Sequence, residues 1–274
     1  MNFFEKISKT INRNNSYLCV GLDPVIEKIP HCLQKGAQPI FQFNKAIIDA
    51  TYDIVCAYKP NLAFYEQYGL SGLEQLIKTV EYIPENIPII IDGKRSDIGN
   101  TARAYAKALF DIYKADSVTI NPLLGFDSVT PFLDYKDKCT FLLALTSNPG
   151  AKDFQALTTA DNNPLYIKMI ETFKSWNKNN NCGLVVGATN GDEISNIRKL
   201  VPDWWFLIPG VGTQGGSLEN VIKYAVPDNN SAKIIINVSR KILYASTEND
   251  FIVSTIKEAK SFKDQINILL NSNK

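Results

Sequence analysis

The chain has 274 residues, 45% of them hydrophobic, and its 29 basic residues nearly balance its 28 acidic ones. This length suffices for one large α/β barrel or for two small domains. The even charge balance argues against a nucleic-acid-binding or membrane-surface protein, which would normally carry a basic excess.

Residues 1–14 have the pattern of an amphipathic helix and lack the long apolar core of a signal peptide. No later apolar run approaches the length of a membrane span. The five cysteines are an odd number without metal-ligand spacing, and four of them lie in or beside apolar, strand-like runs. We therefore expect reduced cysteines and a cytoplasmic protein with no membrane or nucleic-acid partner.

Apolar runs of strand length recur along the chain, and they are nearly continuous rather than alternating. Such runs are typical of parallel strands that are covered on both faces. We predict strands at residues 17–22, 56–59, 89–92, 117–121, 140–146, 183–187, 205–209 and 233–238.

Segments with helical periodicity lie between these strands. We predict helices within residues 37–51, 100–113, 217–224 and 249–270. Asn100 or Thr101 is a candidate cap for the second of them. Eight strands alternating with helices predict a (β/α)8 barrel that forms one domain over residues 1–274, with residues 1–14 as an extra helix closing its bottom.

Residues 88–101 contain the most informative pattern in the chain, because a β-branched apolar run ends there in Asp92, Lys94 and Asp97. Positions i and i+2 of a strand share a face, so Asp92 and Lys94 should point together from the strand end. Lys59 ends the neighbouring strand and should lie near Asp92. We predict an alternating Lys59–Asp92–Lys94–Asp97 network in which both lysines stay protonated and both carboxylates stay ionised. Such a network suits a reaction that creates a carbanion and then protonates it.

His31 is the only histidine and follows a proline in a predicted loop. A multi-histidine metal site is therefore impossible, and a Ser-His-Asp triad would have to use this residue. Acid–base chemistry must rest on carboxylates and lysines.

A phosphate site is predicted after the last two strands, where barrels of this architecture usually hold one. The seventh strand runs into the glycine-rich segment 209–216, whose backbone amides can approach an anion. Arg240 follows the eighth strand and offers a forked, permanently charged donor. Gln214 lies among the glycines and could reach over a bound ligand when the loop closes.

Taken together, these motifs resemble the orotidine 5′-phosphate decarboxylase family, in particular its longer-chain branch. The resemblance covers nearly the whole chain and includes segments 92–99 and 146–150. It implies a lyase that converts orotidine 5′-monophosphate to uridine 5′-monophosphate and CO2, the last step of de novo pyrimidine synthesis, without a cofactor or a metal.

The resemblance also implies a role for each matching residue. Lys94 would donate the proton to C6 of the pyrimidine, and Asp92 would press against the substrate carboxylate. Lys59 and Asp23 would contact the ribose hydroxyls, while Ser147 would hydrogen-bond the pyrimidine edge.

Other matching residues imply a homodimer with shared sites and a region that closes over the phosphate. Asp97, Ile98 and Thr101 would enter the active site of the partner subunit. Ser239 stands where shorter family members usually place a glycine before the arginine. The phosphate-binding and ligand-closing region would comprise Pro209, Gln214, Ser239 and Arg240.

Three other functions are open to a barrel of this kind. The first is that of a related sugar-phosphate barrel, which carries a similar charge array. Such relatives resemble magnesium enzymes that hold the ion partly through a glutamate at the end of the second strand. This chain has Lys59 at that position, and its ammonium would repel the cation. A silent phosphate-ligand-binding barrel would bind nucleotide without releasing CO2, and a scaffold would do neither. Residues 151–163 form an insertion that is either a lid over the base or a surface loop.

Overall fold

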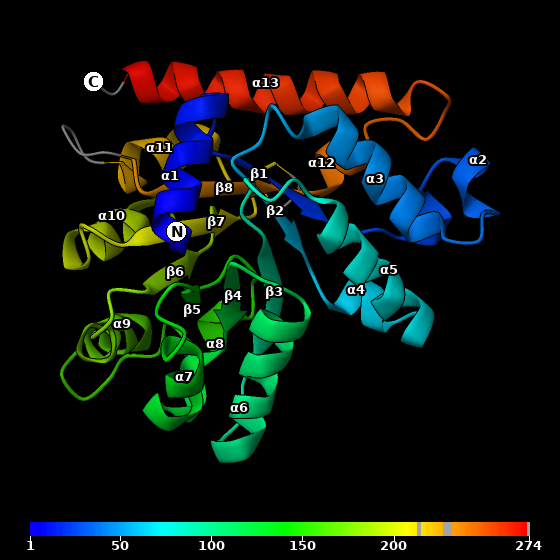
Figure 1. Ribbon diagram of the computed structural model, residues 1–274. Coiled ribbons are helices and arrows are strands. Elements are labelled where there is room, and N and C mark those ends of the chain that lie inside the picture. Colours follow the sequence, from blue (N-terminus) through cyan, green and yellow to red (C-terminus); the bar gives the residue numbers. More distant parts are fainter. Residues whose placement is uncertain (213–214, 227–231, 273–274) are drawn as a thin grey trace.

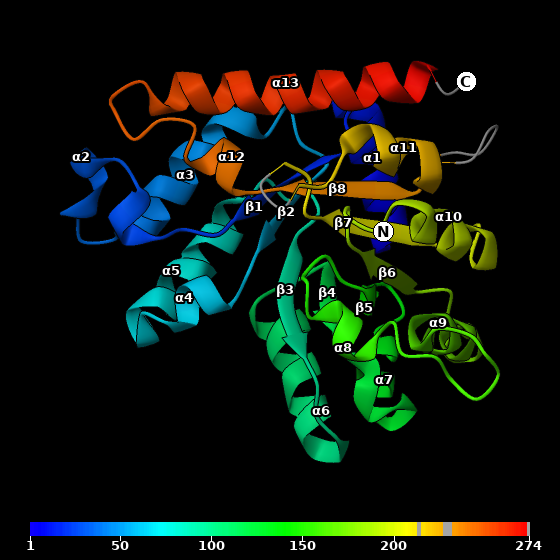
Figure 2. The ribbon, with the colours of Figure 1, turned by 180° about the vertical axis from the view of Figure 1, so that it is seen from behind.

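The computed structural model describes residues 1–212, 215–226 and 232–272. Its centre is an eight-stranded sheet in which the neighbouring strands pair in parallel, in the order β2-β1-β8-β7-β6-β5-β4-β3. Helices surround this sheet (Figures 1 and 2), as expected for a (β/α)8 barrel. The strands are β1 Leu18–Leu22, β2 Ala57–Pro60, β3 Ile90–Arg95, β4 Ser117–Ile120, β5 Cys139–Leu145, β6 Cys182–Val186, β7 Trp205–Pro209 and β8 Ile234–Val238.

The predicted strands agree with these bounds to within one residue, apart from the third, which continues to Arg95. The barrel closes between β2 and β3 through two isolated parallel bridges, Tyr58 to Ile89 and Asn61 to Asp92. This seam therefore has fewer ladder hydrogen bonds than the other strand pairs, and it carries residues of the predicted charge network.

The helices are α1 Phe3–Asn14, α2 His31–Gln34, α3 Pro39–Thr51, α4 Ala63–Glu66, α5 Gly69–Tyr82, α6 Gly99–Lys107, α7 Phe126–Leu133, α8 Ala151–Phe154, α9 Leu165–Trp176, α10 Gly191–Leu200, α11 Leu218–Ala225, α12 Arg240–Leu243 and α13 Phe251–Ser272. Three short helical turns complete the list: η1 Ile26–Lys28, η2 Ala108–Ile112 and η3 Pro122–Leu124. No helix of the described residues is both long and apolar enough to cross a membrane.

Two local predictions are wrong. The N-cap of α6 is Ile98, which makes no side-chain cap hydrogen bond, so neither Asn100 nor Thr101 caps that helix. A glycine at φ 55° begins α6 and turns the chain into it without a polar cap. His31 begins the one-turn helix α2 rather than lying in a loop, and its side chain is exposed.

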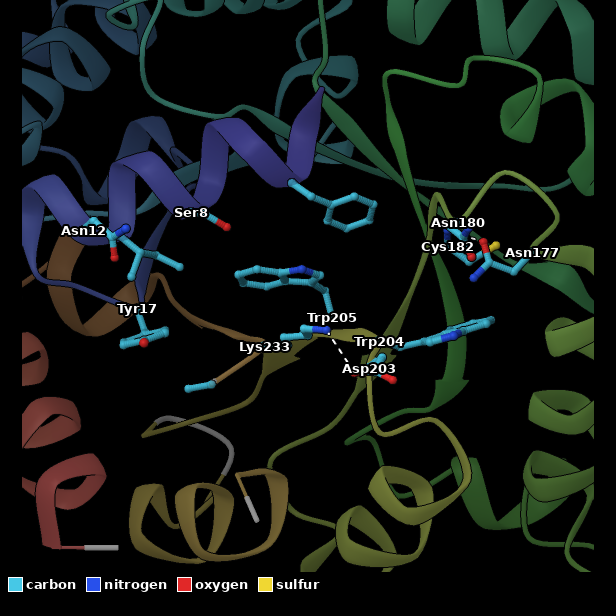
Figure 3. A pocket seen from close by; sticks show the side chains of 13 residues that line it. Ser8, Asn12, Tyr17, Asn177, Asn180, Cys182, Asp203, Trp204, Trp205 and Lys233 are labelled. Atoms are coloured by element: carbon cyan, nitrogen blue, oxygen red, sulfur yellow. Dashed lines mark hydrogen bonds and ion pairs between the residues drawn. The ribbon is translucent and has the colours of Figure 1, made fainter. Parts of the chain in front are cut away.

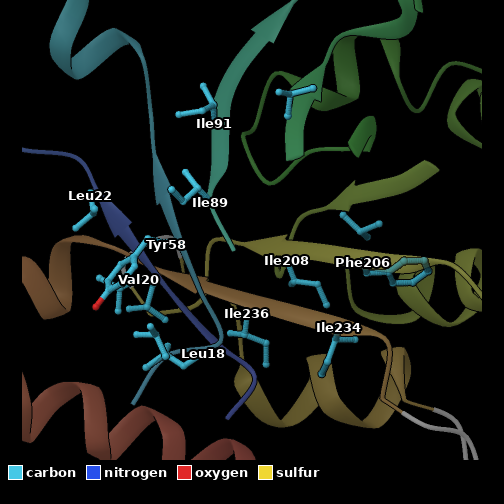
Figure 4. Close-up of a cluster of buried hydrophobic side chains, with 14 of the residues drawn as sticks. Leu18, Val20, Leu22, Tyr58, Ile89, Ile91, Phe206, Ile208, Ile234 and Ile236 are labelled. Atoms are coloured by element: carbon cyan, nitrogen blue, oxygen red, sulfur yellow. The ribbon is translucent and has the colours of Figure 1, made fainter. Parts of the chain in front are cut away.

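Alternating strand residues divide the core into two clusters. One set faces the surrounding helices and includes Leu18, Val20, Ile234 and Ile236 (Figure 4). The other set, which includes Ile235, fills the barrel interior. The side-chain period of two places successive residues on opposite faces of each strand.

Helix α1 packs against the interior cluster, as predicted for a helix closing the barrel bottom. It begins with a capping box in which Asn2 Oδ1 accepts the Glu5 N–H at 3.0 Å and Glu5 Oε2 accepts the Asn2 N–H at 3.2 Å. Phe3 and Ile7 are buried on its inner face, and the Phe3 ring meets Phe141 edge-on at 5.9 Å. Helix α1 therefore lies away from the opposite end of the barrel, where the strands end.

Candidate active site

Asp92 is the centre of a polar network at the seam between β2 and β3. Its Oδ2 accepts from Lys59 Nζ at 3.0 Å, and its Oδ1 accepts from Lys94 Nζ at 2.6 Å. Thr119 Oγ1 on β4 donates to Oδ1 at 2.7 Å, and Asn61 Nδ2 donates to Oδ2 at 3.3 Å. Four donors thus fix the position and the rotation of one carboxylate. The sequence predicted the two lysines of this network and missed Thr119 and Asn61.

The two lysines differ in their access to solvent. The Lys59 side chain is 5% exposed and the Asp92 side chain 9%, whereas that of Lys94 is 46% exposed. Lys59 is therefore enclosed with its counter-ion, and Lys94 is the ammonium that a molecule entering from solvent can reach.

Burial and charge act against each other in this network. Burial by itself would raise the pKa of Asp92, but the Lys59 and Lys94 ammoniums and the Thr119 hydrogen bond outweigh it and hold that pKa below its ordinary value. Burial would lower the pKa of Lys59, but the carboxylates of Asp92 and Asp23 raise it above its ordinary value. Asp92 therefore stays ionised at neutral pH, so it cannot be a proton source.

Asp23 lies just beyond the end of β1 and is held beside the network. Its Oδ1 accepts the backbone N–H of Asn61 at 3.2 Å. Two residues earlier, a Cβ on Gly21 would lie 2.7 Å from Ser239 Cβ and 3.0 Å from Asp23 Oδ2. The missing side chain at Gly21 therefore allows Asp23 and Ser239 to occupy their places at the mouth of the barrel.

Asp97, the fourth member of the predicted network, lies apart from the other three. Its Oδ1 accepts the N–H of Ile98 at 2.8 Å, and no ion pair among the described residues joins it to Lys59 or Lys94. The Ile98 side chain is 56% exposed, and Thr101 is exposed on the first turn of α6. These residues form a surface beside the network within the single chain.

A pocket of about 350 Å³ opens at the ends of β1, β7 and β8. Asp23, Pro209, Ser239 and Arg240 are among its lining residues, so four predicted substrate contacts share one cavity. Gly210 has φ 97° and Gly212 has φ 89°, left-handed conformations that favour glycine and let the backbone turn over the pocket. Gln214 lies outside the described residues.

Asn237, which was not among the predicted site residues, also lines this pocket near the end of the apolar strand β8. It is 8% exposed, and no partner of its Oδ1 occurs in the described part of the chain. A buried amide oxygen with this surrounding is suited to accept a hydrogen bond from a ligand or from water.

Ser147 lies two residues beyond β5, where the backbone passes close to β6. A Cβ on Gly187 would lie 2.5 Å from the Ser147 backbone nitrogen, so a side chain there would displace this segment. The adjoining insertion forms α8 and returns through a bridge between Thr158 and Pro164. Gln155 Oε1 accepts the Thr146 N–H at 2.8 Å and fastens the insertion to the end of β5.

A larger cavity of about 630 Å³ lies at the opposite end of the barrel, between α1 and the beginnings of β6, β7 and β8 (Figure 3). Trp204, Trp205 and Tyr17 line it, together with an ion pair between Lys233 and Asp203 at 3.2 Å. None of the predicted site residues lies there. The charged network and the polar strand ends lie instead on the side of the smaller pocket.

Among the described residues, no group of three or more histidine, cysteine, aspartate and glutamate side chains is arranged to hold a metal ion. The fold is that of a (β/α)8-barrel enzyme, and a carboxylate and two ammoniums lie together at the carboxyl ends of its strands. The model of the orotidine 5′-phosphate decarboxylase / HUMPS family matches residues 16–250. The chain belongs to this family.

Several known proteins are similar over most of the chain. The orotidine 5′-phosphate decarboxylase of Christiangramia forsetii is 48% identical over 265 residues, which cover 96% of each protein. The structure of Leishmania donovani OMP decarboxylase is 36% identical, with a TM-score of 0.86 and coverage of 99% of this chain and 100% of that one. Leishmania donovani UMP synthase is 37% identical with a TM-score of 0.88, and the match covers 98% of this chain but 57% of the synthase.

Proposed function

We propose that this protein is a catalytic (β/α)8-barrel domain that decarboxylates orotidine 5′-monophosphate to uridine 5′-monophosphate and CO2, the last step of pyrimidine nucleotide synthesis. The observation that carries the proposal is the Asp92 carboxylate held between Lys59 and Lys94 beside a pocket lined by Arg240. The similarity to decarboxylases over nearly the full chain supports the same reaction.

The reaction requires a site that stabilises negative charge on carbon. The bond between C6 and the carboxylate breaks, the electron pair stays on C6, and CO2 leaves. The two ammoniums of the network are fixed before the substrate arrives, so they stabilise the developing carbanion without reorganisation. Lys94 then transfers a proton to C6, and the resulting amine regains a proton from solvent.

The geometry favours Lys94 over Lys59 as the proton donor. Lys94 is the more exposed ammonium, whereas Lys59 is enclosed and bound to Asp92. Asp92 stays ionised because its pKa is lowered, so it would lie against the substrate carboxylate as a like charge. Departure of neutral CO2 relieves this repulsion, while Lys59 and Asp23 hold the ribose.

The phosphate of the substrate would occupy the pocket beside Arg240. Arginine presents two parallel N–H donors that match phosphate oxygens. Binding energy gained at this remote group can lower the barrier at C6. A contact of Gln214 with the bound ligand stays a prediction. Ser147 lies beyond β5, from where it would contact the edge of the base.

We propose further that the enzyme is a homodimer whose subunits complete each other's sites. Exposed apolar side chains that follow the ends of β3 and β4 support this proposal: Ile98 is 56% exposed, Leu123 68%, Leu124 52% and Phe126 41%. Ile98 is the N-cap of α6, Leu123 and Leu124 lie on η3, and Phe126 begins α7, which packs against both α6 and η3. An exposed apolar patch of this kind is typical of an interface. Asp97 lies at its edge, so it would reach the site of the partner.

The dimer can be tested by mixing two inactive variants, Asp97→Ala and Lys94→Ala. Random mixing makes half of the dimers mixed, and each mixed dimer has one site with both residues, so about a quarter of all sites should regain activity. No recovery in a sample shown to contain mixed dimers would contradict the shared site. The cytoplasmic location expected from the sequence stays a prediction.

The reaction itself is tested with purified, chelator-treated protein and orotidine 5′-monophosphate. We expect the ultraviolet absorbance of the substrate to fall and CO2 to be released without added metal. Turnover that requires magnesium would favour the sugar-phosphate barrels, in which a metal takes part. Nucleotide binding without CO2 release would identify a silent binding protein, and neither binding nor turnover in a folded sample would favour a scaffold.

A further inference from the structure

Thr119 links the two residues on which the proposed chemistry depends. This β4 residue is 1% exposed, and its hydroxyl makes two hydrogen bonds of opposite direction. It donates to Asp92 Oδ1 at 2.7 Å and accepts the backbone N–H of Lys94 at 3.1 Å. Because the hydroxyl donates its single proton to the Asp92 carboxylate, its oxygen lone pairs can accept the backbone N–H of Lys94. Loss of this hydroxyl would therefore remove one restraint from each partner at once.

The backbone at Lys94 needs such a partner. Lys94 has φ 46°, a left-handed conformation that is strained in a non-glycine residue. In the ladder between β3 and β4, Ile91 pairs with Val118 and Arg95 pairs with Ile120, so three residues of β3 lie opposite Thr119 alone. This bulge removes the Lys94 N–H from the regular ladder, and the Thr119 side chain accepts it instead.

The bulge also determines where the ammonium points. In a regular strand Lys94 would continue the direction of Asp92, since residues two apart share a face. The left-handed turn re-aims the side chain, and its Nζ comes back to lie 2.6 Å from Asp92 Oδ1. Thr119 donates to that same oxygen, so one hydroxyl restrains both the carboxylate and the backbone that carries the lysine.

We propose that Thr119 is a positioning residue that fixes the Lys94 ammonium and the Asp92 carboxylate for proton transfer without touching the substrate. This inference rests on the proposed decarboxylase function. Misplacement of a reacting group by about 1 Å can cost on the order of 100-fold in rate. The effect should fall on kcat rather than on KM, because the phosphate pocket at the ends of β7 and β8 is built from other residues.

Thr119→Val tests this directly, since valine keeps the shape of threonine and lacks the hydroxyl. We expect kcat per nucleotide-binding site to fall about 10- to 100-fold, with KM within about threefold of the unaltered enzyme. Thr119→Ser keeps the hydroxyl and should restore most of the rate. If Thr119→Val does not fold, comparing Thr119→Ala with Thr119→Ser decides the question in the same way.

Thr140→Val is the matched control. Thr140 is a fully buried threonine of the neighbouring strand β5, and its Oγ1 makes no hydrogen bond within the described residues. This variant should keep full activity. If the unaltered enzyme turns over and Thr119→Val keeps its kcat, or Thr119→Ser is as slow as Thr119→Val, the positioning role is refuted. If the unaltered enzyme itself shows no turnover, the failure is that of the proposed function.

Discussion

Replacing Asp92 with asparagine should destabilise the fold as well as inactivate the site. The variant keeps the size of the side chain but removes the negative charge between Lys59 and Lys94. Lys59 is 5% exposed and cannot reach water without moving, so an uncompensated ammonium would remain in the barrel. Breaking a buried ion pair by removing one partner costs about 3–5 kcal/mol. Asp23 still supplies some charge near Lys59, so we expect a loss near the lower limit of that range.

The pH dependence of this loss distinguishes it from a simple packing defect. In the unaltered protein the lowered pKa of Asp92 contributes stability above about pH 4, and the raised pKa of Lys59 contributes stability below about pH 10. Stability from this pair should therefore be flat around neutrality. In Asp92→Asn, burial without its main counter-ion should lower the pKa of Lys59, so the unfolded chain binds more protons than the folded one. Stability of the variant should then rise from pH 7 toward pH 10.

Thermal unfolding followed by circular dichroism measures both effects, with Lys94→Ala as the comparison. Lys94 is 46% exposed, so its removal should cost about 1 kcal/mol or less. We expect Asp92→Asn to lower Tm at pH 7 by roughly 6–12 °C, and this deficit should shrink at pH 9.5. An Asp92→Asn variant that is as stable as Lys94→Ala at pH 7, with no gain at higher pH, would refute the description of Lys59 as a buried charge dependent on Asp92.

Two further substitutions test the pocket. Arg240→Ala should raise the KM for the phosphorylated substrate about 10- to 100-fold, because a charge-assisted hydrogen bond is worth about 1.5–3 kcal/mol; an unchanged KM would place the phosphate elsewhere. Gly21→Ala should lower turnover by pushing Asp23 and Ser239 from their places, while Gly36→Ala, whose new Cβ would approach no closer than 3.4 Å, should have no effect. Equal activity of the two glycine variants would show that the close packing at Gly21 is not needed.

The barrel was predictable because its strands are nearly continuous apolar runs separated by helical periodicity, a pattern that depends on local sequence. The continuation of β3 to Arg95 was not, because the apolar run stops at Asp92 and the remaining residues are charged or glycine. At the bulge the Lys94 N–H donates to Thr119, which lies 25 residues later on another strand. A local sequence pattern cannot predict a contact between residues so far apart in the chain.

The site residues were likewise predictable in part, where a local sequence pattern marks them. Lys59, Asp92 and Lys94 stand out as charges at strand ends, and the structure brings them together. Thr119 and Asn237 were missed because each lies in an apolar strand, where a polar residue of that size is usually a satisfied core residue. Asp97 was expected to complete the network, but it lies outside the network within one chain. The contribution that we propose for it requires a neighbouring subunit, which a single sequence does not display.

Exchange of the hydrogen at C6 of uridine 5′-monophosphate for deuterium in D2O, measured by nuclear magnetic resonance, tests the proposed role of Lys94 most directly. If a C6 carbanion is formed and protonated by Lys94, the same steps in reverse must remove that hydrogen and replace it with deuterium. We predict measurable exchange with the unaltered enzyme and none with Lys94→Ala, although the variant still binds the nucleotide. Exchange by Lys94→Ala at the rate of the unaltered enzyme would contradict the assignment of Lys94 as the proton donor.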